Sequence, residues 1–218
     1  MTIWSELLAA LWRPEGALTL ALLAAALPFR PWATLRRASL QHVWLGTLVV
    51  LPWWWSLHVL LPAQMPLQLS GACLLVLMFG WPLAVWTLVP VAALGAWLGG
   101  IAPGRAADLL FWLGLLPATL GLGLGLLTRR LLPRHLFVYI LGRGFFATAV
   151  AMMAAGAARV LLAPPAPDAD PALLMIGHVL IGWGEAFATG GLTAVFVAFR
   201  PEWLLTWSDR RYLPRDRA

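Results

Sequence analysis

Long apolar stretches make up most of the chain, and short segments rich in Pro and Arg separate them. The apolar stretches cover residues 15–29, 39–62, 68–101, 106–128, 135–163 and 172–199. A helix needs ~20 apolar residues to cross the hydrocarbon core of a bilayer, so most of these stretches are long enough for one crossing. The pattern predicts an all-α, polytopic helical membrane protein. Residues 1–218 are expected to form a single transmembrane domain.

The stretch 68–101 is too long for one crossing, and the sequence Gly80-Trp81-Pro82 interrupts it. A proline preceded by glycine breaks or kinks a helix, so we expect a pair of shorter helices that meet there. Arginine clusters at 30–37 and 129–134 mark two loops that are both cytoplasmic by the positive-inside rule. An even number of crossings must then separate the two loops. The result is about seven transmembrane helices, with the N-terminus outside and the C-terminus cytoplasmic.

Composition agrees with this class, since 61% of the residues are hydrophobic and 11% are charged. The net charge of +6 comes from Arg in short loops and in a basic C-terminal tail, which indicates membrane topology and not a nucleic-acid surface. Cys73 is the sole cysteine, so the chain has no intramolecular disulfide and no CxxC metal site. Residues 3–12 are too short to span and are expected either at the outer interface or tucked back into the bundle.

Ionisable residues inside the apolar stretches are the candidate functional residues, because lipid rarely tolerates them without a role. His178 and Glu185 are seven residues apart, two helical turns, and so project from nearly the same face. His58 and Gln68 fall at comparable depth, which predicts one outward-facing substrate pocket. Arg143 lies inside the stretch 135–163 and is the expected charge partner of Glu185. Two alternatives stay open: an interfacial role for His58, and a purely structural Arg143–Glu185 pair.

Three sequence features carry a resemblance. They are the step from His178 to Glu185, the segment Arg200-Pro201-Glu202, and the run QLSGACLLVLMFGWPLAVW that begins at Gln68. Together they resemble the cobalt/nickel M-component (CbiM-like) permeases of energy-coupling-factor transporters, in a divergent branch. In that family the final helix carries a His and a Glu-Gly, and an earlier segment reads His-Leu-Thr-Gly.

Departures from the family concern its metal ligands. The family uses the N-terminal amino group, the His that follows Met, and the His of the His-Leu-Thr-Gly segment. Here Thr2 and Gln68 stand at those two His positions. A hydroxyl and a carboxamide bind nickel or cobalt less well than imidazole. The resemblance leaves Met1, His178 and Glu185 as candidate ligands of a transported Co or Ni ion, and it implies no permanently bound cofactor.

The expected function is that of a substrate-binding permease subunit in the bacterial inner membrane, for a divalent transition metal or another small solute. The chain has no GxxxxGK[ST] motif, so transport would need separate ATPase subunits and a coupling transmembrane subunit. Ala17, Ala21 and Ala25 form a small-residue row that suits the coupling subunit. Membrane lipids are the other partners, and no nucleic acid is expected. The alternative is a non-transporting scaffold or assembly factor that kept the fold. An enzyme is disfavoured, since HExxH and GxSxG are absent.

Overall fold

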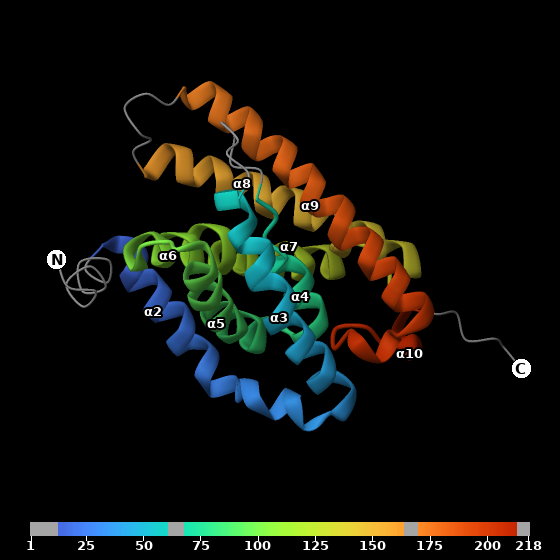
Figure 1. Ribbon diagram of the computed structural model, residues 1–218. Coiled ribbons are helices and arrows are strands. Elements are labelled where there is room, and N and C mark those ends of the chain that lie inside the picture. The colour runs from blue at the N-terminus through green and yellow to red at the C-terminus, as the bar shows by residue number, and fades with distance from the viewer. Residues whose placement is uncertain (1–12, 61–67, 164–169, 213–218) are drawn as a thin grey trace, which may run out of the picture.

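The computed structural model describes residues 13–60, 68–163 and 170–212 (Figure 1). Every regular element in these ranges is helical. Within them, four helices are long and apolar enough to cross a membrane: Trp81–Gly99, Pro103–Leu131, Val138–Leu162 and Pro171–Phe199. A shorter apolar helix covers Pro14–Phe29. The prediction of an all-α fold is confirmed, and the four long apolar helices are compatible with a membrane protein. The count of seven crossings and the sides of the termini stay predictions.

The helices follow the predicted apolar stretches. In chain order they are α2 (Pro14–Ala26), η1 (Leu27–Phe29), η2 (Pro31–Arg36), α3 (Ala38–Leu60), α4 (Ala72–Phe79), α5 (Trp81–Gly99), α6 (Pro103–Leu109), η3 (Leu110–Leu115), α7 (Leu116–Leu131), η4 (Val138–Phe146), α8 (Ala147–Leu162), α9 (Pro171–Phe199), η5 (Pro201–Trp203) and α10 (Asp209–Tyr212). The elements α6, η3 and α7 form one continuous helix, as do η4 and α8, and η3 and η4 are π-type turns within them.

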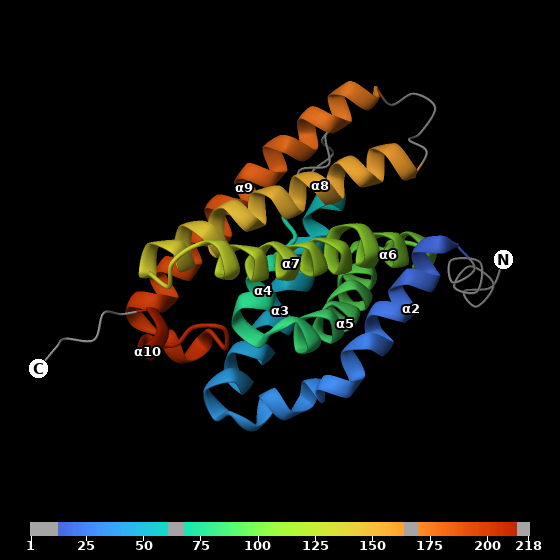
Figure 2. The same cartoon turned by 180° about the vertical axis from the view of Figure 1, so that it is seen from behind.

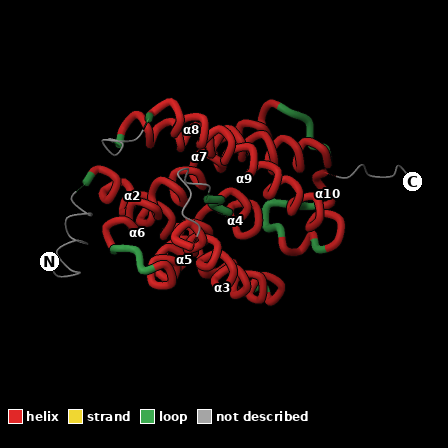
Figure 3. Tube along the Cα trace, turned by 45° about the horizontal axis from the view of Figure 1, so that its top comes forward, coloured by secondary structure: helices red, strands yellow, loops and turns green. Residues whose placement is uncertain are grey.

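The short helix α4 lies at the centre of the bundle. α8 and α9 pack side by side along one flank, and α2, α3 and α5 form the opposite flank (Figures 1 and 2). α4 contacts α5, α7 and α9, and seven of its eight residues are buried. Figure 3 shows loop segments at the ends of several helices and one loop in the middle of the bundle, beside α4.

The chain breaks between α4 and α5 at Gly80, as predicted. Gly80 has a φ of 76°, a conformation that residues with a side chain rarely adopt. Pro82 then lies in the first turn of α5, where its missing N–H costs no hydrogen bond. With eight residues, α4 is ~12 Å long and cannot by itself cross a core of ~30 Å.

Small residues bring α9 into close contact with η4 and α8. Gly182, Ala186 and Gly190 recur every fourth residue on α9, and all three are buried. A β-carbon at Gly190 would lie only 3.1 Å from Cβ of Phe145. Such spacing lets two helix backbones approach each other in a membrane. This row of small residues was not predicted, although its spacing is visible in the sequence.

The C-terminal segment 204–212, expected as part of a basic tail, folds back onto the bundle. The backbone N–H of Leu205 donates to the Met78 carbonyl at 2.9 Å, and the N–H of Thr206 donates to the Leu77 carbonyl at 3.3 Å. The Thr206 hydroxyl also donates to the Leu77 carbonyl, at 2.8 Å. These bonds satisfy carbonyl groups at the end of α4 that have no partner within the helix.

Candidate functional site

The segment 68–71 enters the bundle as non-helical backbone directly before α4. Gln68 and Ser70 are both buried there. The Gln68 side-chain amide donates to the Trp55 carbonyl at 2.7 Å, and the Trp55 indole N–H donates to the Ser70 carbonyl at 2.9 Å. Non-helical backbone is tolerated at membrane depth only where protein groups satisfy it. Trp55 of α3 therefore holds this segment on one side.

The Ser70 side chain holds the same segment on the other side. Its hydroxyl donates to the Leu113 carbonyl in η3 at 2.5 Å. It also accepts a hydrogen bond from the backbone N–H of Ala72 at 3.0 Å. Leu113 lies in the π-type turn η3, where the hydrogen bonds of the helix backbone differ from those of an α-helix. Its carbonyl group accepts the bond from Ser70 at this irregular position.

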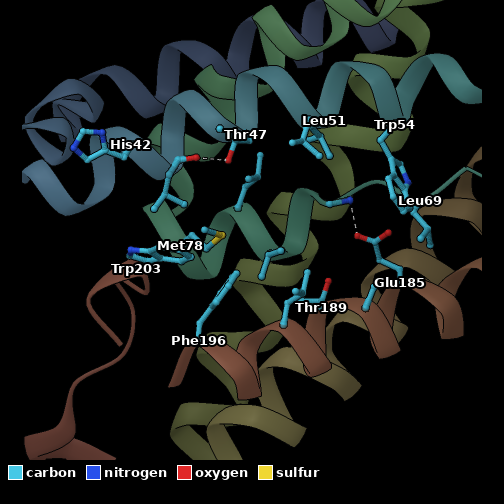
Figure 4. Close-up of a pocket in the computed structure, with 18 residues that line it drawn as sticks. His42, Thr47, Leu51, Trp54, Leu69, Met78, Glu185, Thr189, Phe196 and Trp203 are labelled. Carbon is cyan, nitrogen blue, oxygen red and sulfur yellow. Dashed lines mark hydrogen bonds between the residues drawn. The ribbon is translucent and has the colours of Figure 1, made fainter. Parts of the chain in front are cut away.

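Glu185 binds the backbone at the start of α4. Glu185 is 1% exposed, and its carboxylate accepts hydrogen bonds from the N–H of Ser70 at 2.7 Å and of Gly71 at 2.6 Å. Figure 4 draws the bond from Gly71. The first N–H groups of a helix have no partner within the helix, and the helix dipole favours a negative charge there. Charge-assisted bonds of this kind are among the stronger ones. Glu185 thus acts as an N-terminal cap supplied by another helix.

Gly71 makes this arrangement possible. Its φ is 71°, in the left-handed region that favours glycine. A β-carbon there would also lie 2.8 Å from Cδ1 of Leu51. The Ser-Gly pair before α4 was noticed in the sequence only as part of a family likeness, and its role as the partner of Glu185 was missed.

Arg143 is not the charge partner of Glu185. Its guanidinium lies 5.3 Å from the centre of the Tyr139 ring and donates to the Tyr212 hydroxyl at 3.5 Å. The predicted pair fails because η4 and α8 run antiparallel to α9 in a register that sets Gly144 against Thr193. Arg143 is therefore level with a position about seven residues beyond Glu185, or ~10 Å along the helix axis.

His178 and Gln68 do come together. Both line a cavity of about 30 Å³ between η3, α8 and α9, together with Trp112 and Arg159. His178 is half-buried and lies against Gly156, where a β-carbon would overlap its ring. Glu185 does not line this cavity; it lines a larger groove on the other side of the 68–71 segment. The predicted single pocket is therefore divided, with Gln68 and His178 in one part and Glu185 in the other.

The small cavity has a positive character. Arg159 makes no ion pair with any described residue, and Gln68 uses its amide nitrogen for Trp55. A volume of about 30 Å³ is larger than the ~10–15 Å³ that one water molecule needs, so the cavity accepts a small polar group. Arg159 was not singled out in the sequence, although a lone Arg near the end of a spanning helix is a signal that could have identified it.

The described residues do not form the metal site that the family resemblance implies. Within residues 13–60, 68–163 and 170–212, no three His, Cys, Asp or Glu residues form a group that could hold a metal ion. Met1, Thr2 and the His58 side chain lie outside the described residues. Both oxygens of Glu185 already accept hydrogen bonds from Ser70 and Gly71, so Glu185 is better suited to holding α4 than to binding a metal.

The groove that Glu185 reaches has a volume of about 560 Å³ and lies between α3, α4 and α9. Figure 4 shows His42 and Trp203 at one end of it, and Trp54, Leu69 and Glu185 at the other. Apart from His42, Thr47, Glu185 and Thr189, the side chains that line it are apolar.

Comparison with known proteins does not assign the chain to a family. No family model, no curated protein and no solved structure matches the chain. A functional assignment therefore rests on the residues themselves.

Proposed function

We propose that the chain is a substrate-binding permease subunit of an energy-coupling-factor type transporter in the bacterial inner membrane. The observation that carries the proposal is the small polar cavity where Gln68, Arg159 and His178 meet inside the helices. Polar and charged groups that face an internal cavity of a membrane protein typically mark a solute site. In an apolar scaffold, these groups would otherwise cost stability.

The proposed topology has seven crossings, with the N-terminus outside and the C-terminal residues cytoplasmic. In this arrangement the 68–71 segment and α4 together make one crossing. The cavity then lies in the outer half of the membrane, because His178 is near the outer start of α9. Substrate arriving from outside would meet Gln68 and His178 first, and Glu185 would hold the α4 end beneath them.

The substrate we propose is a small polar solute. Arg159 weighs against a bare divalent cation, because like charges repel strongly at a site shielded from water. Binding of nickel or cobalt would need further ligands such as Met1. The chemistry of Arg159, Gln68 and His178 suits a group that accepts hydrogen bonds, such as a carboxylate or an oxyanion.

Binding measurements on the purified protein with a free N-terminus test the proposed class of substrate. Metal content is measured by mass spectrometry after titration with nickel, cobalt, zinc and copper, and a thermal-shift series covers small carboxylates and oxyanions. We expect an anion to raise the melting temperature of the native chain and of His135→Ala, whose side chain is exposed, but not of His178→Ala. Glu185→Gln should weaken binding while the fold is retained, because it loosens the 68–71 segment that carries Gln68 into the cavity. Stoichiometric metal binding that is lost in His178→Ala would favour a metal substrate, and no binding of any solute would contradict the proposal.

Separate ATPase subunits and a coupling transmembrane subunit are the proposed partners. Ala17, Ala21 and Ala25 are exposed on α2 and offer a face where another helix can approach closely. We expect Ala17→Leu combined with Ala21→Leu to abolish co-purification of the ATPase subunits from native membranes. Ala154→Leu, at an exposed alanine on α8, is the matched control. Equal recovery of ATPase with both variants would count against this contact.

A non-transporting scaffold is the second candidate. The observation that favours it is the complete use of the Glu185 carboxylate by Ser70 and Gly71, which explains its burial without a solute. A scaffold would bind no solute and would co-purify with no ATPase. The two experiments above therefore separate the two candidates.

A further inference from the structure

The groove between α3, α4 and α9 is long. Along α3 it extends from His42 to Trp54, twelve residues, or ~18 Å at the rise of an α-helix. Its volume of about 560 Å³ is spread along this length, and most of the side chains that line it are apolar. An extended hydrocarbon chain fits this shape.

The groove is open to the surrounding membrane along its side. Val50 is 61% exposed on α3, and Leu192 is 42% exposed on α9. Leu75 and Met78 of α4 form the buried floor between the two helices. The length of ~18 Å is close to half of the ~30 Å hydrocarbon core, which is the depth that one leaflet supplies. A lipid chain of a single leaflet can therefore occupy the groove from the side.

Charge at one end of the groove selects the kind of lipid. His42 and Trp203 close this end, and the guanidinium of Arg200 lies 6.0 Å from the Trp203 ring (Figure 4). Arg36 and Arg37 are exposed directly before α3, at the same end of the helix as His42. Glu202, which pairs with Arg200 at 3.6 Å, compensates only part of this positive charge. Basic residues at a helix end beside a groove bind anionic headgroups.

We propose that this groove is a lipid site that holds one acyl chain of an anionic phospholipid, with its headgroup at Arg200 and His42. The site does not depend on the transport function, because it lies on the far side of the 68–71 segment from the polar cavity. The bound chain covers apolar side chains of α3, α4 and α9 that would otherwise face an unfilled space.

Gly46 provides a way to fill the groove with protein. It lines the groove on α3, and a β-carbon there would meet nothing within 4 Å. Gly46→Phe therefore introduces a ring beside the groove from a β-carbon that meets no neighbour. Gly123→Phe is the matched control, because Gly123 also has open space around it, lies in α7 and does not line the groove.

The test uses the full chain, delipidated in detergent and titrated with palmitoyl-oleoyl phosphatidylglycerol or with the corresponding phosphatidylcholine. Native mass spectrometry counts the lipids bound. We expect one phosphatidylglycerol on the native chain and on Gly123→Phe, and at least about tenfold weaker binding to Gly46→Phe, the loss that displacing two buried methylenes would cause. Unchanged phosphatidylglycerol binding by Gly46→Phe would overturn the proposal. So would a polypeptide that co-purifies with the native chain and is lost with Gly46→Phe while lipid binding persists.

Headgroup preference is measured with Arg200→Gln. The control is Arg130→Gln, which removes the same charge from an exposed position at the end of α7. We expect Arg200→Gln, and not the control, to lower the preference for phosphatidylglycerol over phosphatidylcholine. Equal binding of the two lipids by the native chain would overturn the assignment of an anionic headgroup.

Discussion

At its N-terminal end α4 is held chiefly by one charged side chain, with the Ser70 hydroxyl as a further partner, whereas at its C-terminal end it is held chiefly by the backbone of a neighbouring segment. Glu185 accepts both hydrogen bonds at the first end. The amides of Leu205 and Thr206 and the Thr206 hydroxyl supply three donors at the second end. A single substitution can remove all of the first set, but it can remove only one bond of the second. The N-terminal end should therefore be the more sensitive to mutation.

Replacing Glu185 by Ala should have the largest effect. It leaves the buried N–H groups of Ser70 and Gly71 without partners, each at a cost of ~1–3 kcal/mol, so we expect the free energy of unfolding to fall by about 2–6 kcal/mol. Denaturant unfolding in detergent micelles, followed by tryptophan fluorescence, measures it. Glu185→Gln should fall between the native chain and Glu185→Ala, because its carbonyl oxygen can still accept one bond. Native stability of Glu185→Ala would show that the cap is dispensable.

Ser70→Ala should weaken the same end to a smaller extent. The change removes the bond to the Leu113 carbonyl and the bond from the Ala72 N–H, while Glu185 keeps both of its partners. We expect a loss of about 1–3 kcal/mol in the free energy of unfolding. The same unfolding assay applies, and a loss as large as that of Glu185→Ala would mean that Ser70, and not the carboxylate, dominates this end.

Gly156→Ala should disturb the helix that carries Glu185. Its new methyl group would overlap the His178 ring, and overpacking typically costs ~1–3 kcal/mol. We expect about 1 kcal/mol, the low end of that range, since a half-buried ring can move aside. Gly191→Ala is the control, because its β-carbon meets nothing within 4 Å. If both variants have equal melting temperatures, the close approach of α8 and α9 at His178 contributes nothing.

The smallest effect is expected for Thr206→Val at the other end of α4. The variant loses the hydroxyl bonds to the Leu77 carbonyl and to Tyr139, but the backbone amides of residues 205 and 206 keep theirs. We expect a loss of about 0.5 kcal/mol in the unfolding assay, the low end of the range for a hydrogen bond. A loss that exceeds the one for Glu185→Ala would reverse the comparison between the two ends.

The helices could be predicted from the sequence because Pro and Arg mark their ends directly. The break at Gly80 was equally visible, since glycine followed closely by proline disfavours a continuous helix. The burial of residues 204–212 was not, because their Arg-rich surroundings indicate a tail. Leu204, Trp207 and Tyr212 are nevertheless buried, and the rings of Trp207 and Tyr212 stack at 4.9 Å.

The candidate site was only partly predictable. The meeting of Gln68 with His178 followed from their shared depth in the membrane. The partner of Glu185 could not be deduced, because backbone N–H groups are the same at every residue except proline and leave no mark in a sequence. Arg143 was the visible side-chain alternative. Arg143 could be excluded only once the register of η4 and α8 against α9 was known. Packing at Gly144 and Gly156 sets this register.

Both groups that complete α4 come from later parts of the chain. Ser70 and Glu185 are 115 residues apart, and Leu77 and Thr206 are 129 residues apart. During synthesis, α4 therefore leaves the ribosome long before the groups that satisfy its two ends. Until α9 and the segment after it have been inserted, the end groups of α4 must remain bonded to water or to the insertion machinery. The middle of the protein is thus expected to be the last part to reach its final position.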